Sequence, residues 1–210
     1  MDITFSNTDI TEFKIARTFG QCAFDELNST YNLLKTHDDL TTKTKEESFD
    51  DKYANGGVND SRLELVKEEA FQYLSKAVIL YQSSMESIIA LAESHNPDLE
   101  KKIKKIKGFK KRWEFILNYF GESQIEFNEY ESKLYQELRI PLTHLSPNKE
   151  ERLNQIKNMS FEKVYIGMRY GWWSYMRVLK GLNLHDNSWE RICSNGLEPS
   201  LFMDKHPDKL

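Results

Sequence analysis

The stretch from residue 61 to residue 94 carries the pattern that most restricts how this chain can fold. It holds neither glycine nor proline, and its apolar residues recur at steps of three and four, the spacing of an α-helix. They form two adjoining stripes, so the helix presents a wide apolar face that other elements must cover. We therefore predict a central helix over 61–94, with stripes Leu63, Val66, Ala70, Tyr73, Ala77, Leu80 and Leu74, Val78, Tyr81, Met85, Ile88, Ala92.

Helical spacing recurs in most of the remaining chain, and 9 Gly and 5 Pro in 210 residues are few for a protein with many turns. Further helices are predicted over 11–37, from Asp98 to Gly121 with a break at Gly108, from the capping box at Ser123 to Pro141, over 149–157 and over 160–181. The predicted fold is a single all-α domain over 1–210, a bundle of four to five long helices.

Two segments lack this pattern. Residues 38–60 hold ten charged residues and an Asn-Gly-Gly sequence, with almost no aliphatic side chain. Such a segment buries too little apolar surface to offset its ordering entropy, so we predict that it is mobile. The stretch 195–210 contains Pro199 and Pro207 and is predicted to be an irregular tail.

The helix predicted over 160–181 has two distinct faces. One is a seven-residue repeat typical of core packing, and it holds half of the aromatic cluster Tyr170, Trp172, Trp173 and Tyr175. Core packing therefore explains this cluster better than a base-stacking platform, although Trp173 lies off the repeat. The other face carries Gly167, Gly171 and Ser174, where a second helix can approach closely. We expect a homodimer that uses this face and the segment 139–144.

Composition excludes several classes of protein. The net charge of −4 excludes a uniformly basic nucleic-acid binder, and the isolated Cys22 and Cys193 exclude a disulfide scaffold or a zinc motif. The sequence contains no glycine-rich phosphate loop, no paired Glu-x-x-His elements and no Gly-x-Ser-x-Gly elbow, so no cofactor and no metal are expected. Neither a signal-peptide pattern nor an apolar run of about 20 residues occurs, so we expect a cytoplasmic protein without a membrane partner.

One short segment concentrates positive charge. Of 29 Lys and Arg residues, eight lie between 101 and 112 with no acidic residue among them, which leaves 21 basic against 33 acidic residues elsewhere, a net charge of −12. Such segregation lets an acidic protein bind a phosphate backbone, although a plain solvated helix face is the alternative. The candidate RNA-binding residues are Lys101, Lys102, Lys104, Lys105, Lys107, Lys110, Lys111 and Arg112.

A second feature is the spacing Arg-x4-His, formed by Arg139 and His144. On an unbroken helix the two side chains would diverge by about 140°. Pro141 is expected to disrupt the helix and bring them closer. Alternatively, Arg139 pairs with a surface carboxylate and His144 caps the C-terminus of a helix.

The heptapeptide Leu138-Arg139-Ile140-Pro141-Leu142-Thr143-His144 resembles the motif of the HEPN superfamily, helical-bundle proteins that include many RNA-cleaving toxins and defence nucleases. The resemblance covers about 60 residues, from the helix before the motif through the long helix after it. It implies an HEPN-like bundle and a metal-independent endoribonuclease with a defence or toxin role. It also implies a homodimer, in which two Arg–His pairs face one cleft.

The chemistry implied by this resemblance suits the two residues. The ribose 2′-OH attacks the adjacent phosphorus, and His144 moves a proton from the nucleophile or to the leaving 5′-oxygen. Arg139 stabilises the charge of the phosphorane. The catalytic candidates are therefore Arg139 and His144.

Two alternatives remain open. The bundle can be a non-catalytic module that binds RNA, a nucleotide or a protein partner encoded in the same operon. The apolar Ile140, where active members usually carry a polar residue, favours this reading. The other alternative is a structural or regulatory bundle without a ligand.

Overall fold

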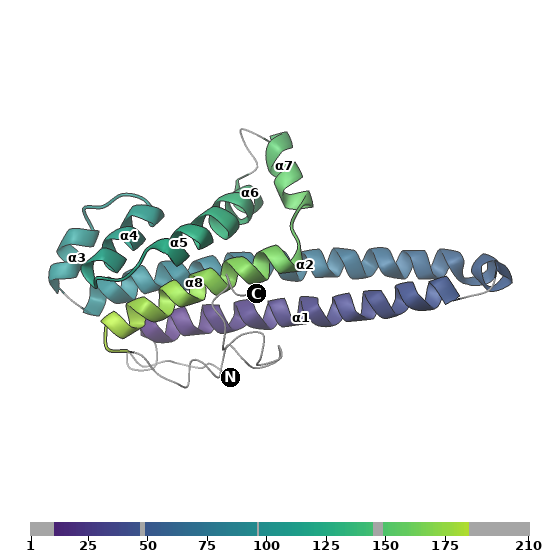
Figure 1. The fold of residues 1–210 in the computed structure, drawn as a ribbon, viewed down its shortest axis with the longest axis horizontal. Coiled ribbons are helices and arrows are strands. Elements are labelled where there is room, and N and C mark those ends of the chain that lie inside the picture. The colour runs from purple at the N-terminus through teal and green to yellow at the C-terminus, as the bar shows by residue number, and fades with distance from the viewer. Residues whose placement is uncertain (1–10, 47–48, 96, 145–148, 185–210) are drawn as a thin grey trace, which may run out of the picture.

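The computed structural model describes residues 11–46, 49–95, 97–144 and 149–184, and within these ranges all regular secondary structure is helical (Figure 1). The all-α prediction is thereby confirmed. The elements in chain order are α1 (Glu12–Glu46), α2 (Phe49–His95), α3 (Pro97–Ile103), α4 (Phe109–Tyr119), α5 (Ile125–Tyr130), the π-helix η1 (Glu131–Arg139), α6 (Ile140–Thr143), α7 (Lys149–Lys157) and α8 (Phe161–Gly181).

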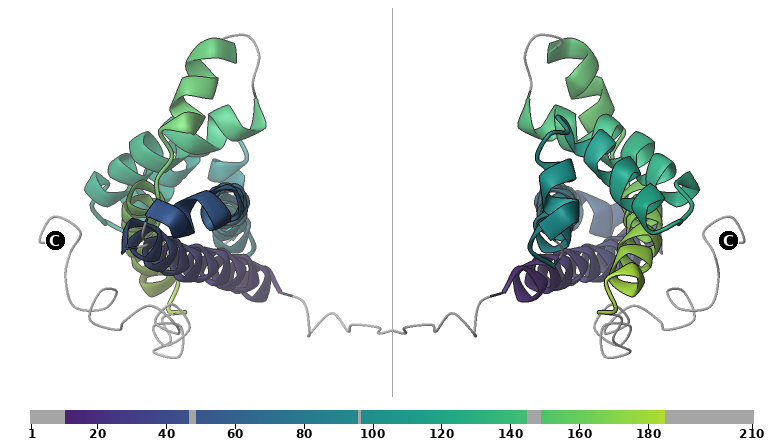
Figure 2. Two further views of the ribbon diagram at one scale, coloured as in Figure 1. Left: turned by 90° about the vertical axis from the view of Figure 1, so that its right-hand side faces the viewer. Right: turned by 90° about the vertical axis from the view of Figure 1, so that its left-hand side faces the viewer.

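The two longest helices, α1 and α2, form an antiparallel hairpin on which the other elements assemble. α8 lies along the hairpin, and α3, α4 and α5 cover the C-terminal half of α2, while α7 stands away from the hairpin (Figures 1 and 2). The closed end of the hairpin extends past all of these elements (Figure 1). Among the described residues, no helix combines the length and the apolar character needed to cross a membrane.

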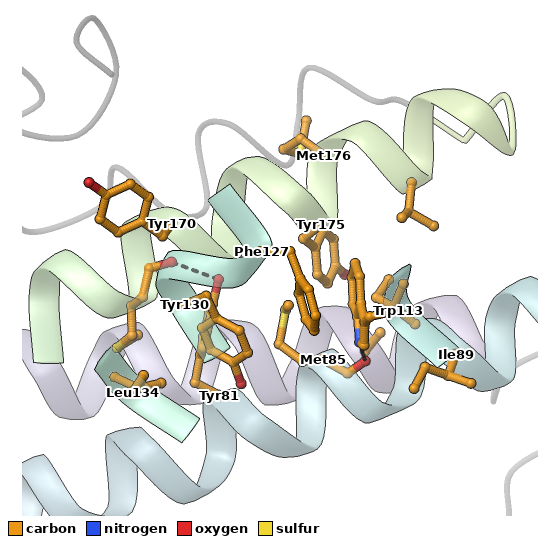
Figure 3. Packing of buried hydrophobic residues seen from close by; sticks show 14 of the residues in the cluster. Tyr81, Met85, Ile89, Trp113, Phe127, Tyr130, Leu134, Tyr170, Tyr175 and Met176 are labelled. Carbon is orange, nitrogen blue, oxygen red and sulfur yellow. Dashed lines mark hydrogen bonds between the residues drawn. The ribbon is translucent and has the colours of Figure 1, made fainter. Parts of the chain in front are cut away.

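The core confirms that α2 is central. All six residues of its second predicted stripe, from Leu74 to Ala92, are buried. Trp113 of α4 is fully buried, donates a hydrogen bond from Nε1 to the carbonyl of Met85 at 3.2 Å, and stacks on Phe127 with a ring separation of 5.2 Å (Figure 3). The α2 stripe thus holds α4 and α5 against the hairpin through large aromatic side chains.

The segment 38–60 differs from its predicted secondary structure. α1 continues to Glu46 and α2 already begins at Phe49, so most of this segment is helical, although helix was predicted only on either side of it. Starting a helix is costly, but extending one that is already formed adds one hydrogen bond for each further residue that is ordered. The packed parts of α1 and α2 provide such a start, so each helix can extend into this segment. Lys and Glu residues near the end of α1 also favour helix. The predicted mobility of this segment stays a prediction, and the tail 195–210 lies outside the described residues.

The small-residue face of α8 packs inside the chain. A Cβ atom at Gly167 would lie 2.8 Å from Cδ1 of Leu134, and one at Gly171 would lie 2.7 Å from Cε1 of Tyr81. Ser174 is fully buried and donates to the carbonyl of Tyr170 at 3.1 Å. The expectation that this face joins two copies is therefore wrong, because α2, α5 and η1 already occupy it. The seven-residue repeat does pack into the core, as predicted.

An ion cluster ties α8 to the start of α5. Arg177 donates from Nη1 to Glu122 at 2.9 Å and from Nη2 to Glu126 at 2.5 Å. The Glu126 side chain is only 5% exposed, whereas that of Arg177 is 33% exposed. A buried carboxylate requires such a partner, because removing the cation would leave an uncompensated charge in the interior.

Candidate functional site

Arg139 lies on one continuous helix made of α5, η1 and α6, and Pro141 does not break it. Arg139 keeps helical dihedrals of −62° and −47°, and the helix ends only after Thr143. The break expected at Pro141 is therefore wrong. The preceding nine residues instead adopt π geometry, in which the N–H of Ile140 bonds to the carbonyl of Tyr135, five residues earlier. The wider π turn relieves the contact between the proline ring and the carbonyl four residues before it.

The Arg139 side chain is held against the helices beside it. Its Nη2 lies 3.9 Å from Oε1 of Glu86, and its guanidinium carbon lies 5.4 Å from the centre of the Tyr135 ring. The Arg139 side chain remains 22% exposed. The guanidinium is thus positioned at the surface, with a carboxylate partner supplied by α2.

Glu86 connects Arg139 to a buried hydrogen-bond chain. Gln82 donates from Nε2 to Glu86 at 2.9 Å, and Tyr130 donates its hydroxyl proton to Oε1 of Gln82 at 2.5 Å. Burial raises the pKa of Tyr130 well above its ordinary value, and the negative charge of Glu86 adds to this effect. The phenol therefore stays neutral and keeps its role as a donor. The chain fixes the orientation of Glu86, and through it the position of Arg139.

His144 terminates α6. Its backbone N–H bonds to the carbonyl of Ile140 at 2.9 Å, its φ of −139° leaves the helical region, and its side chain is exposed. In the part of the chain that the structure describes, neither a hydrogen bond nor an ion pair joins His144 to Arg139. Each residue thus has the surroundings of the simpler alternative, a carboxylate partner for Arg139 and a helix terminus for His144.

The basic run spans α3, the turn at Gly108 and the first residues of α4. Three of its eight cations have carboxylate partners: Lys101 lies 3.9 Å from Asp98, Lys104 pairs with Glu100, and Lys110 lies 3.2 Å from Glu131. The charge of the run is therefore partly balanced within the protein, because helical spacing supplies two of these acids and tertiary packing supplies the third.

The other five cations of the run do not form ion pairs with carboxylates of the described residues. Within the described residues, no carboxylate oxygen lies within 4 Å of Lys102, Lys105, Lys107, Lys111 or Arg112. Lys102 lies over the ring of Tyr119, and the Nε of Arg112 donates to the carbonyl of Ile106 at 2.9 Å. We call these five residues the free basic set. Ile103 and Trp113, both fully buried, anchor the segment that carries them.

A groove of about 370 Å³ separates α2 from the start of α4. Arg112 of the free basic set lines it, and so does Glu86, the partner of Arg139. The groove therefore lies between the basic run and the carboxylate that pairs with Arg139. Its residues are Glu86, Ile89, Ala90, Glu93, Gly108, Phe109 and Arg112.

Sequence reasoning missed the α2 wall of this groove. Glu86 and Glu93 are seven residues apart, a spacing that places two side chains on one face of a helix about 10 Å apart. That spacing is a usable signal, but it does not reveal which element lies opposite. The described residues contain no group of three or more His, Cys, Asp or Glu side chains able to hold a metal ion.

Comparisons with known proteins add no assignment. No protein-family model, curated protein or solved structure matches the chain.

Proposed function

We propose that this protein binds single-stranded RNA along α3 and the start of α4. The observation that carries the proposal is the free basic set, five cations within eleven consecutive positions that have no carboxylate partner among the described residues. Cations that are not neutralised within the protein can release counterions from a phosphate backbone, which supplies most of the affinity in such complexes.

The adjoining groove favours a single strand over a duplex. An unpaired strand offers exposed base faces, which apolar and aromatic surfaces accept. Ile89, Ala90 and Phe109 provide such a surface beside Arg112. In this arrangement the backbone follows the free basic set, and a base enters the groove.

The test replaces three members of the free basic set by the Lys105→Gln, Lys107→Gln and Lys111→Gln substitutions together. Fluorescence anisotropy with a labelled 12-nucleotide RNA at 100 mM salt should show at least a tenfold weaker Kd, because several phosphate contacts are lost. The matched control carries Lys149→Gln, Lys157→Gln and Lys180→Gln, which removes the same charge from exposed positions of α7 and α8. Equal weakening in both triple variants would show that only net charge matters and would refute the proposal.

A second candidate function is metal-independent RNA cleavage by an HEPN-like homodimer. It is favoured by the exposure of His144 at the end of a helix that also presents Arg139 at the surface. In this candidate, a complete site combines Arg139 of one copy with His144 of the other. The 2′-oxygen would attack phosphorus as its proton leaves, and the bond to the 5′-oxygen would break as that oxygen gains a proton, with His144 as the proton carrier.

Subunit complementation tests this candidate directly. Arg139→Ala and His144→Ala should each reduce cleavage by roughly 10²–10⁴ in rate, with EDTA without effect. Mixing the two inactive variants should restore part of the activity, because a mixed dimer contains one intact pair. Cleavage by His144→Ala at the wild-type rate, or binding of RNA without any cleavage, would rule out the catalytic assignment.

A further inference from the structure

The groove between α2 and α4 has two walls of opposite charge and an apolar floor. Glu93 stands on the α2 wall, and Arg112 stands on the α4 wall. Ile89, Ala90 and Phe109 form the apolar part between them. Phe109 is itself held in place by stacking on Tyr135, with a ring separation of 4.9 Å and an interplanar angle of 21°.

The two charged residues are available to a ligand. Within the described residues, the Glu93 carboxylate has neither a hydrogen bond nor an ion pair, whereas Glu86 is engaged by Gln82 and Arg139. Arg112 uses its Nε for the carbonyl of Ile106, which fixes the guanidinium and leaves both terminal nitrogens without a carboxylate partner. A fixed guanidinium loses little freedom on binding an anion.

Gly108 lines the groove beside open space. It lines the groove with a φ of +93°, and a Cβ atom there would meet no other atom within 4 Å. This dihedral, which glycine adopts readily, belongs to the residue directly before α4, the helix that carries Arg112. A flat ligand can thus lie on the apolar floor without displacing a side chain at this position.

A ligand complementary to this groove needs a flat apolar body for the floor, adjacent N–H donors at one edge for Glu93 and an anionic group for Arg112. Guanine presents N1–H and N2–H side by side, and two parallel donors match the two oxygens of a carboxylate. Adenine, cytosine and uracil place an acceptor next to each donor on that edge, and this acceptor would face a carboxylate oxygen. A phosphate on the same nucleotide suits Arg112 and the neighbouring lysines.

From this complementarity we infer that the groove is a guanine nucleotide site, in which Glu93 recognises the base and Arg112 holds the phosphate. The inference rests on the proposed function where it concerns RNA, since it makes the groove the base-recognising part of the RNA-binding surface. Glu86, the carboxylate partner of Arg139, also lines the groove.

The test measures binding of GMP, AMP, CMP and UMP to the full chain by isothermal titration calorimetry without added metal. GMP should bind at least tenfold more tightly than the other three. Glu93→Gln should reduce this preference to less than threefold, because a carboxamide replaces one acceptor by a donor. Arg112→Ala should weaken binding of all four about equally, and it should reduce the advantage of GMP over guanosine that the wild type shows. Glu68→Gln, an exposed substitution elsewhere on α2, is the matched control and should change nothing.

A second arm separates this inference from the proposed function. The heptanucleotides UUUGUUU and UUUAUUU are compared by anisotropy with the wild type and with Glu93→Gln. RNA binding with no preference for G, together with no preference for GMP, would overturn the guanine site and leave RNA binding standing. A preference for GMP without RNA binding would support the site and refute RNA binding. A GMP preference that Glu93→Gln leaves intact would overturn the role of Glu93.

Discussion

The salt dependence of RNA binding can be worked out from the ion pairs of the basic run. Each phosphate that a protein cation neutralises on a single strand contributes about −0.7 to the slope of log K against log salt. The five residues of the free basic set predict a slope of about −3.5, whereas all eight cations of the run would give about −5.6. Lys101, Lys104 and Lys110 are left out because Asp98, Glu100 and Glu131 already balance them.

These slopes differ enough to be measured. Raising the salt from 50 to 200 mM should weaken binding about 100-fold for five contacts and about 2,000-fold for eight. Anisotropy titrations with a labelled 12-nucleotide RNA at four salt concentrations provide the slope. The triple variant at Lys105, Lys107 and Lys111 should retain a slope of about −1.4, and the α7–α8 control should keep the wild-type value.

Two results would refute the reasoning. A slope near −5.6 would mean that RNA displaces the internal carboxylates, so the ion pairs would not reduce the number of phosphate contacts. A slope that is equal in the triple variant and the wild type would mean that the phosphates lie elsewhere on the protein.

Three further predictions concern the scaffold. Arg177→Met should destabilise the fold by about 3 kcal/mol, because it leaves buried Glu126 without its cation. Adding Glu126→Gln should recover more than half of that loss in urea denaturation. Additive effects of the two substitutions on the unfolding free energy would contradict this. Gly171→Ala should lower the unfolding free energy by about 1–2 kcal/mol, although alanine has the better helix propensity. The reason is that the added Cβ atom would lie 2.7 Å from the buried Tyr81 ring. A raised Tm of the variant would count against this close packing. Burial raises the pKa of Tyr130 in the folded protein, whereas tyrosine in the unfolded chain ionises near pH 10. The neutral phenol therefore contributes its full stabilisation below about pH 10, and this contribution to the unfolding free energy is lost as the pH rises further. Tyr130→Phe should therefore lose less stability than the wild type between pH 8 and pH 11, and parallel losses in urea denaturation would show that Tyr130 does not titrate in this way.

Apolar periodicity predicted those parts of the fold that local spacing and caps determine. Residues 149–157 form the predicted short helix, and Ser160 is the N-cap of α8, where its hydroxyl accepts from the N–H of Lys163 at 3.2 Å. The positive φ of Gly108 separates α3 from α4 as predicted. In each case the determining groups lie within a few residues of one another.

Features that depend on tertiary partners could not be predicted in this way. Lys110 and Glu131 are 21 residues apart in sequence, so their ion pair follows only from the packing of η1 beside α4. The packing of α2, α5 and η1 on the small-residue face of α8 also depends on tertiary partners. Small residues on a helix indicate that another element packs closely against it, but they do not identify that element. The helical state of 38–46 and 49–60 reflects cooperativity, which composition alone does not measure.

The π-helix before Arg139 has a consequence for how this chain can change over time. A π turn behaves as an α-helix that has absorbed an additional residue, so deleting one residue within Glu131–Arg139 can restore ordinary α geometry without opening the chain. Every position on one side of the deletion would then rotate by about 100° relative to the other. With α5 fixed by the buried Phe127 and Tyr130, Arg139 would leave Glu86 and face a different neighbour. A single codon deletion would thus redirect this guanidinium, and it would also turn the buried Leu138 that precedes it, so the core beside η1 would have to repack around the shortened helix.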